Sequence, residues 1–238
     1  MSKTLYLFDV DGTLVYSGGR DSRCFGDSYA AVFGRPFPTL DWTRFPAVTD
    51  HVIFGTAFRK HFNRLPSPEE HRRFEEHYVA ALTQVRGEDG AAYAAVPGAV
   101  AYWRALELDP AALVGVATGG WRRAQSVKLA HVGLPAAPRY AGYADGKTSR
   151  RAILQEAIDR ARKDYELASV VYFGDAVWDL QTTREMGLPF VGIRRRGDLD
   201  YLTGRGHPEV ARDFSDSMYV DDLVKRALGR FYPPSGGS

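Results

Sequence analysis

The sequence predicts an α/β protein: a doubly wound parallel-sheet core with an all-helical cap domain inserted after the first strand. Short, continuous apolar runs such as Leu5–Phe8 and Ala112–Ala117 are typical of strands buried on both faces. Beyond Pro97 such runs alternate with helical segments over short connections, as in a parallel sheet covered by helices on both sides. Between the first run and Pro97 the pattern is helical, which indicates the insertion.

The chain opens with the strand Leu5–Phe8, and two carboxylates follow directly at its end. Asp9 and Asp11 are two residues apart, so their side chains leave the same face of an extended backbone, and Gly12 then allows a sharp turn. Ligands of open α/β sheets bind at the carboxyl ends of strands. Because two ionised carboxylates about 4 Å apart repel by roughly 4 kcal/mol at an effective dielectric near 20, the pair indicates a bound cation or a shared proton.

The predicted cap shows helical periodicity and no convincing strand from Arg20 to about Ala95. One apolar stripe ends at Gly34, a residue type that is common just after a helix. Ser67 and Glu70 mark the start of a later helix as N-cap and capping-box partner. These signals predict a bundle of helices inserted into the core.

The second part of the core continues the alternation of strands and helices. The further strands expected there are Ala112–Ala117, Tyr140–Tyr143, Ser169–Phe173 and Leu188–Ile193, and the helices include Arg122–His131, Ser149–Arg162 and Leu223–Leu228. We therefore expect residues 1–16 and 97–232 to form the core domain, 17–96 the cap domain and 233–238 a flexible tail.

Composition narrows the classes of function. The chain has 238 residues and a formal net charge of +2, which gives no reason to expect nucleic acid or an anionic membrane as a partner. Its one cysteine, Cys24, excludes an intramolecular disulfide and a multi-cysteine metal site, and suits a reducing compartment. Without a signal peptide or an apolar run of about 18–20 residues, the sequence predicts a cytoplasmic protein with no membrane span.

Groups suited to a phosphate ester and a divalent cation follow several of the predicted strands. They are Asp9 and Asp11, Thr118 and Gly119, Asp175 and Asp179, and Lys147 on a loop. Clustered carboxylates bind Mg²⁺, whereas a hydroxyl, backbone N–H groups and an ammonium bind phosphoryl oxygens. One carboxylate can attack phosphorus to give an aspartyl-phosphate, while a second protonates the leaving oxygen and later activates water.

These residues also stand in the order of four known motifs. Asp9-Val10-Asp11-Gly12-Thr13, Thr118, Lys147 and Gly174-Asp175-Ala176-Val177-Trp178-Asp179 resemble the motifs of the haloacid dehalogenase superfamily. With a helical cap between the first two motifs, the chain is similar to the phosphatase branch typified by phosphoglycolate phosphatase-like proteins. The resemblance extends over nearly the whole chain, from about Thr4 to Leu228.

The resemblance implies the roles of the four acidic residues. Asp9 would be the nucleophile and a Mg²⁺ ligand. Asp11 would be the general acid and base, and its main-chain carbonyl would also bind the metal. Asp175 would complete the metal site, and Asp179 would bind the metal or orient a water on it. Dehalogenases of this superfamily lack an acid at the position of Asp11, so its presence favours phosphoryl transfer over carbon–halogen cleavage.

The resemblance also implies the groups that bind the phosphoryl oxygens. Thr118 and the N–H of Gly119 would hold them, and Lys147 would balance their charge. Two features depart from the usual pattern: Lys147 is followed by Thr-Ser where proline is frequent, and Thr118 by Gly-Gly where Asn-Gly is frequent. Lys128 is the alternative cation, but its position in the middle of a helix favours a solvent-facing side chain, so we expect the role to fall to Lys147.

Residues that would contact the substrate are harder to assign from the sequence. Gly12 and the polar pair Thr49 and Asp50 are candidates, although the pair is equally suited to begin a helix. Arg20 could meet a substrate anion, or it could be a solvated arginine near the hinge. The run Arg194–Arg196 leaves the last strand at the same edge and could add a positive field, although such runs are usually solvated.

The sequence therefore predicts a Mg²⁺-dependent phosphatase that hydrolyses a small phosphorylated metabolite, phosphoglycolate- or sugar-phosphate-like, through an aspartyl-phosphate. A phosphomutase of the same fold is the alternative. A 2-haloacid dehalogenase is less favoured because of Asp11, and a non-catalytic binding module because every motif position carries competent chemistry. The oligomeric state, monomer or homodimer, stays open.

Overall fold

The central feature of the computed structural model is a six-stranded, fully parallel sheet with the order β5-β4-β1-β6-β7-β8. The structure describes residues 2–17, 19–88, 90, 92–194 and 200–231, so the expected tail 233–238, Arg195 and Arg196 lie outside the described residues. The strands are β1 Lys3–Phe8, β4 Ala112–Ala117, β5 Tyr140–Gly142, β6 Leu167–Gly174, β7 Phe190–Ile193 and β8 Val210–Ala211. The predicted fold class is confirmed.

Strand β1 lies in the middle of the sheet and pairs in parallel with β4 on one side and β6 on the other. The chain extends the sheet from β1 through β4 to β5, then crosses over to β6 and continues outward to β7 and β8. This reversal brings the carboxyl ends of β1, β4 and β6 together at one edge. In a doubly wound sheet, that is where a ligand binds.

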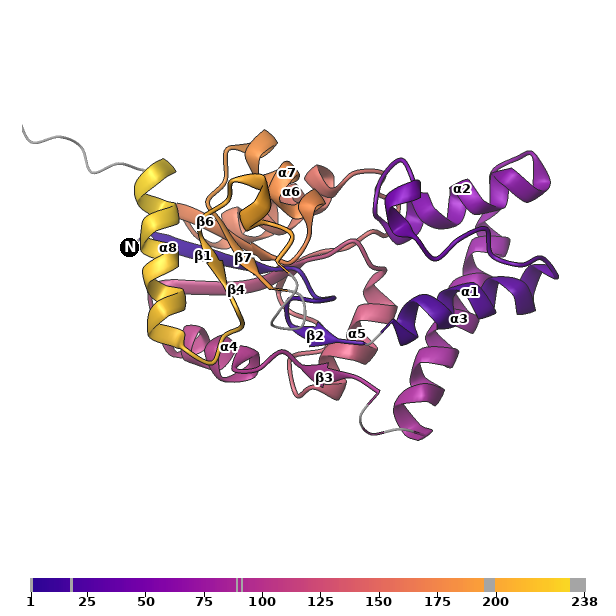
Figure 1. Cartoon of the computed structure of the whole chain (residues 1–238), viewed down its shortest axis with the longest axis horizontal. Helices are drawn as coiled ribbons and strands as arrows, with labels where there is room; N and C mark the ends of the chain where they lie inside the picture. Colours follow the sequence, from indigo (N-terminus) through magenta and orange to yellow (C-terminus); the bar gives the residue numbers. More distant parts are fainter. Residues whose placement is uncertain (1, 18, 89, 91, 195–199, 232–238) are drawn as a thin grey trace, which may run out of the picture.

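Helices cover both faces of the sheet (Figure 1). They are α4 Ala99–Leu108, α5 Arg122–His131, α6 Arg150–Asp164, α7 Val177–Met186 and α8 Ser217–Phe231. Alternation along β6 shows how the faces differ. Phe173 stacks on Phe8 at 4.5 Å between ring centroids and packs against Tyr102 of α4, whereas the hydroxyl of its neighbour Tyr172 contacts Arg150 of α6.

The inserted helices gather beside the core (Figure 1). They are α1 Arg20–Phe33, α2 Asp50–Phe62 and α3 Pro68–Glu88, with the short 3₁₀ turn η1 Trp42–Arg44 between α1 and α2. The predicted helix signals are confirmed: Gly34 ends α1 with φ 65°, Ser67 N–H donates to Glu70 Oε2 at 2.8 Å, and Glu70 N–H donates to Ser67 Oγ at 3.2 Å. No helix within the described residues is both long and apolar enough to cross a membrane.

The shortest strands were not predicted from the sequence. Val15–Tyr16 (β2) pairs antiparallel with Ala94–Ala95 (β3), so the chain enters and leaves the helical region side by side. Two residues carry no detectable periodicity, and the same limit explains why β8 was not predicted. The C-terminal helix α8 also starts earlier than expected, at Ser217 instead of Leu223.

One core side chain lies inside the aromatic cluster of the cap helices. Trp121 follows β4, is fully buried, and lies 5.8 Å from the ring centroids of both Phe25 in α1 and Phe74 in α3. It also packs against Phe54 in α2 at 6.0 Å. The core and the cap therefore share one apolar cluster.

The substitution Trp121→Ala tests the energetic weight of this shared cluster. Loss of a fully buried indole leaves a cavity, so we expect the free energy of unfolding in urea to fall by about 3–5 kcal/mol. The control Tyr219→Ala removes a ring that is 42% exposed on α8, and its effect should stay within about 0.5 kcal/mol. Equal effects of the two variants would contradict the described packing.

Candidate active site

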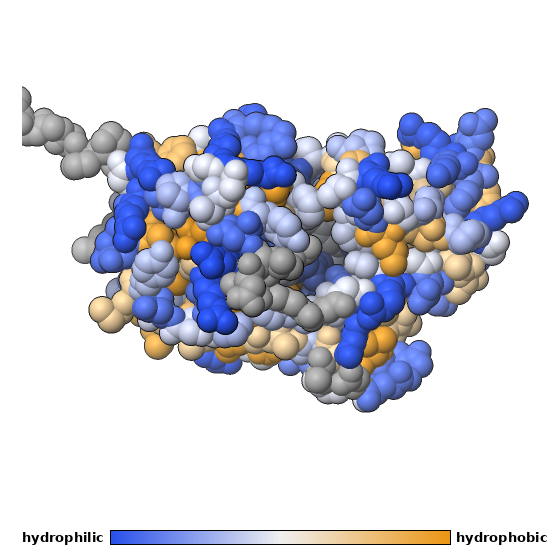
Figure 2. Space-filling model, viewed as in Figure 1, coloured by the Kyte–Doolittle hydropathy of each residue, from blue (hydrophilic) through white to orange (hydrophobic). Residues whose placement is uncertain are grey.

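A cavity of about 430 Å³ lies between the carboxyl edge of the sheet and the cap helices. Figure 2 shows this face as a mostly hydrophilic surface with a hollow between the two parts of the molecule. Most of the expected site residues line the cavity: Asp9, Asp11, Gly12, Thr49, Asp50, Thr118 and Gly119. The topology thus brings together groups that lie more than 100 residues apart in the sequence.

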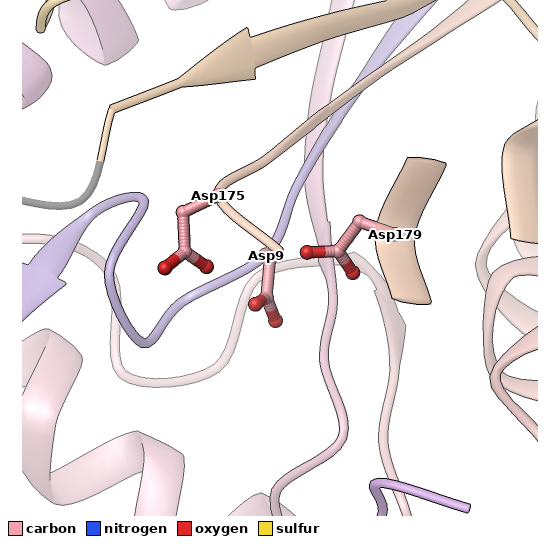
Figure 3. A group of neighbouring side chains, drawn as sticks. All are labelled: Asp9, Asp175 and Asp179. Carbon is pink, nitrogen blue, oxygen red and sulfur yellow. The ribbon is translucent and has the colours of Figure 1, made fainter. Parts of the chain in front are cut away.

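Three buried carboxylates form a cluster beside this cavity. Asp9 follows β1, Asp175 follows β6, and Asp179 lies in the first turn of α7. Each offers one carboxylate oxygen, and these oxygens all lie within 4.8 Å of one another. Figure 3 shows Asp9 between the other two, with the three carboxyl groups side by side.

Two glycines permit this close approach. Gly12 has φ +87°, and a Cβ there would lie only 2.2 Å from Asp175 Oδ2. A Cβ on Gly174 would lie 2.6 Å from Asp179 Oδ2. Gly12 therefore has a steric role, since the turn after Asp9 can reach Asp175 only without a side chain at this position.

The cluster fits a divalent cation. Burial raises the pKa of Asp9 to about 6, although the nearby Arg150 guanidinium acts in the opposite direction. Asp9 Oδ1 is buried and accepts no hydrogen bond from the described residues. A hard cation with oxygen ligands would satisfy this oxygen and offset the repulsion among the carboxylates, which is the chemistry of Mg²⁺.

The cation nearest the cluster is Arg150, which the sequence analysis missed. Its guanidinium forms an ion pair with Asp179, lies 3.4 Å from Asp9 Oδ1, and donates to the Tyr172 hydroxyl at 3.3 Å. The helical period could have revealed this position. Arg150 is followed at spacings of three and four by buried Ile153 and Leu154, so it begins the buried face of α6.

Lys147, the expected phosphoryl-binding cation, is not among the residues that line the cavity. Its ammonium donates to the Asp145 carbonyl and forms an ion pair with Glu156 Oε2 at 2.7 Å. The N-cap of α6 is Ser149, so Lys147 lies before the helix, and its side chain contacts the partly exposed Glu156 within the helix.

Lys128 does not face solvent, so that expectation is wrong. Its side chain is 1% exposed, and its Nζ donates to Asp11 Oδ1 at 2.6 Å and to Asp21 Oδ2 at 3.1 Å. Although burial disfavours the charged ammonium, the two carboxylates hold the pKa of Lys128 well above its usual value. A position in the middle of a helix does not determine which face a residue occupies, and here α5 turns this face toward the cavity.

The side chain of Asp11 is held by two residues of α5. Gln125 Nε2 donates to Asp11 Oδ2 at 2.9 Å, while Lys128 holds the other oxygen. Burial raises the pKa of Asp11, and Lys128 partly opposes that rise. These contacts fix the orientation of the carboxylate beside Asp9.

The remaining candidates divide between the cavity and the surface. Thr118 is buried and lines the cavity, and its hydroxyl accepts the Gly120 N–H at 3.4 Å. Thr49 accepts the Val52 N–H at the start of α2, which confirms its role in beginning that helix, and it also lines the cavity. Arg20 is the first residue of α1 and is not among the lining residues.

Asp50 connects the cap to the loop after β4. Its N–H donates to the Gly119 carbonyl at 2.7 Å, and its Oδ2 accepts the Trp121 N–H at 2.9 Å. Burial raises the pKa of Asp50 to about 7, despite the hydrogen bond from Trp121. The carboxylate therefore lies in the cavity and is anchored on the core side.

Solved structures of other proteins share this fold. A hydrolase from Pseudomonas syringae matches with a TM-score of 0.68 at 18% identity, over 93% of this chain and 98% of that one. CbbY from Rhodobacter sphaeroides, solved with phosphate, matches with a TM-score of 0.66 at 18% identity, over 93% and 100% of the two chains.

Sequence comparison defines the family. The profile of the haloacid dehalogenase-like hydrolases matches residues 6–184, so this chain belongs to that family and is an enzyme of the hydrolase class. It is also similar to glycerol-1-phosphate phosphohydrolase 2 of Saccharomyces cerevisiae, at 26% identity over 92% of this chain and 94% of the yeast protein. The resemblance drawn from the motifs is confirmed.

The two lysines allow a direct test of the site's electrostatics. Lys128→Met leaves Asp11 and Asp21 buried without their cation, so we expect the free energy of unfolding to fall by about 3–5 kcal/mol. Lys147→Met removes a partly exposed ion pair with Glu156 and should cost at most about 1 kcal/mol. Urea unfolding of both variants measures the difference, and a larger loss for Lys147→Met would refute the placement of the two side chains.

Proposed function

We propose that this hydrolase is a Mg²⁺-dependent phosphatase that acts on a small phosphorylated metabolite through an aspartyl-phosphate. The observation that carries the proposal is the Asp9 carboxylate. It is buried beside Asp175 and Asp179, one of its oxygens accepts no hydrogen bond from the described residues, and a second carboxylate, Asp11, lines the same cavity. The similarity to a glycerol-1-phosphate phosphohydrolase supports a small phosphate ester as the substrate.

The reaction would proceed in two displacements. An Asp9 oxygen attacks phosphorus, the bond from phosphorus to the ester oxygen breaks, and Asp11 gives that oxygen its proton. Asp11 then takes a proton from water, which attacks the phosphorus of the aspartyl-phosphate and releases inorganic phosphate. Gln125 and Lys128 keep Asp11 oriented through both steps.

The phosphoryl group would be held by several groups of the chain. Thr118 and the Gly119 N–H would bind its oxygens from the loop after β4, and Arg150 would supply the positive charge first expected from Lys147. Asp9, Asp175 and Asp179, with the Asp11 main-chain carbonyl, are the proposed Mg²⁺ ligands. When bound, Mg²⁺ would neutralise negative charge on the phosphoryl oxygens.

A phosphomutase would use the same first displacement, but a sugar hydroxyl would replace water in the second. Dependence on a bisphosphate would distinguish it from a phosphatase.

The domain bounds also stay a proposal: residues 17–96 form the cap domain, and residues 1–16 with 97–232 form the core domain. The cytoplasmic location and the monomeric or homodimeric state also stay predictions.

Asp9→Asn tests the nucleophile and the metal together. We expect the wild-type protein with Mg²⁺ to release phosphate from a panel of small phosphate esters and from p-nitrophenyl phosphate. The variant, whose amide cannot attack phosphorus, should be slower by at least about 10³-fold, and excess chelator should abolish wild-type turnover. A folded wild-type protein that binds Mg²⁺ but releases no phosphate would contradict the proposal and favour the mutase or the binding module.

Arg150 and Lys147 are distinguished by activity. Loss of the cation beside Asp9 in Arg150→Met should lower kcat by about 10²–10³-fold, whereas Arg150→Lys, which keeps the charge, should retain more activity. Lys147→Met should stay within about threefold of the wild-type kcat, because its ammonium pairs with Glu156 outside the cavity. Circular dichroism establishes that each variant is folded, and the reverse order of activities would restore Lys147 to the site.

A further inference from the structure

The described lining of the cavity is rich in carboxylates. Two cap residues contribute carboxylates to the lining, Asp21 from α1 and Asp50 from α2. The core adds Asp9 and Asp11. The described lining residues include only two cations to set against these four carboxylates, Lys128 and Arg150.

Both cations are already paired with carboxylates of the protein. Lys128 donates to Asp11 and Asp21, and Arg150 is paired with Asp179 and lies 3.4 Å from Asp9. Neither therefore offers an unpaired charge to the part of a substrate that lies beyond the phosphoryl group. A second phosphate or a carboxylate at that end would meet acidic side chains without a compensating cation among the described residues.

The two cap carboxylates differ in how well they are satisfied. Asp21 accepts the Ser17 hydroxyl at 2.5 Å as well as the Lys128 ammonium. Asp50 accepts one hydrogen bond, from the Trp121 N–H, and forms no ion pair with any described residue. Burial raises the pKa of Asp50, and the Trp121 hydrogen bond and the charge of Lys128 only partly oppose that rise. Asp50 thus has acceptor capacity left for a ligand.

We infer that the site takes monophosphate esters whose alcohol part is not anionic and offers a hydrogen-bond donor to Asp50. Asp50 is then a specificity-determining residue, which accepts a hydroxyl or ammonium of the leaving group and repels a carboxylate or second phosphate. This inference rests on the proposed phosphatase function. It deepens that function by narrowing the substrate class to esters of alcohols that carry a further hydroxyl or an ammonium group, and it disfavours phosphoglycolate and bisphosphates.

Three esters of equal chain length test this inference. 2-Hydroxyethyl phosphate, phosphoethanolamine and phosphoglycolate differ only in their terminal group, which is a hydroxyl, an ammonium or a carboxylate. At a pH above the pKa of Asp50, which is about 7, the kcat/KM of the Mg²⁺-loaded wild-type protein should be higher for the first two than for phosphoglycolate by at least about tenfold, because a second anion then meets like charge. This ratio tests the inference without any variant.

The variant Asp50→Asn assigns the selectivity to one residue. Removal of the negative charge should bring the kcat/KM for phosphoglycolate closer to that for 2-hydroxyethyl phosphate, mainly through a lower KM for phosphoglycolate. The matched control is Asp27→Asn, the same change at an exposed position of α1, which should leave the wild-type ratio unaltered.

The outcomes separate the inference from the function on which it rests. If wild-type protein hydrolyses phosphoglycolate as well as or better than 2-hydroxyethyl phosphate, the inference fails and the phosphatase proposal stands. If the ratio in Asp50→Asn equals that of the wild type, Asp50 is not the specificity residue and the inference is overturned in that part. If no ester is hydrolysed, including p-nitrophenyl phosphate, the phosphatase proposal itself fails.

Discussion

The repulsion among buried carboxylates at one edge of the sheet is the constraint on which the site depends. Asp9, Asp175 and Asp179 are held together by glycines that allow close approach, and burial raises the pKa of Asp9. Arg150 offsets part of this cost from α6. Because three carboxylates share this one guanidinium, the cluster keeps an excess of negative charge that fits a divalent cation. Such a cation would in turn fit a phosphate dianion.

A second set of ion pairs, centred on Lys128, connects the cap to the core. Lys128 of the core lies between Asp11, which the proposed mechanism uses as acid and base, and Asp21 of the cap. The position of the cap helix α1 is thereby linked to the orientation of Asp11. Trp121 adds an apolar connection and Asp50 a hydrogen-bonded one, so three contacts of different chemistry join the two parts around the same cavity.

The fold could be predicted from the sequence because its determinants are local. Buried parallel strands need continuous apolar runs, and the strands β1, β4 and β6 have them. The acidic positions were equally accessible, since each directly follows such a strand or begins the next helix. The two-residue strands β2, β3 and β8 could not be found, because their pairing depends on partners distant in the chain.

The choice of cation could not be made from motif order alone. Lys147, Lys128 and Arg150 carry the same formal charge, and what separates them is the carboxylate that each side chain reaches. The spacing of the buried residues in α6 indicates that Arg150 lies on the buried face of the helix. A buried arginine is expected, however, only once its acidic partners are known to lie nearby. Side-chain pairing across the fold is therefore the information that the sequence patterns lacked.

The short ribbon formed by Val15–Tyr16 and Ala94–Ala95 gives the insertion a modular character. Because its two ends are adjacent partners in an antiparallel pair, about 5 Å apart, a segment of almost any length can be accommodated there without displacing the sheet. Evolution can thus exchange the inserted helices while it preserves the sheet and the acidic cluster at its edge. The same junction offers a natural place to graft a foreign lid onto this scaffold.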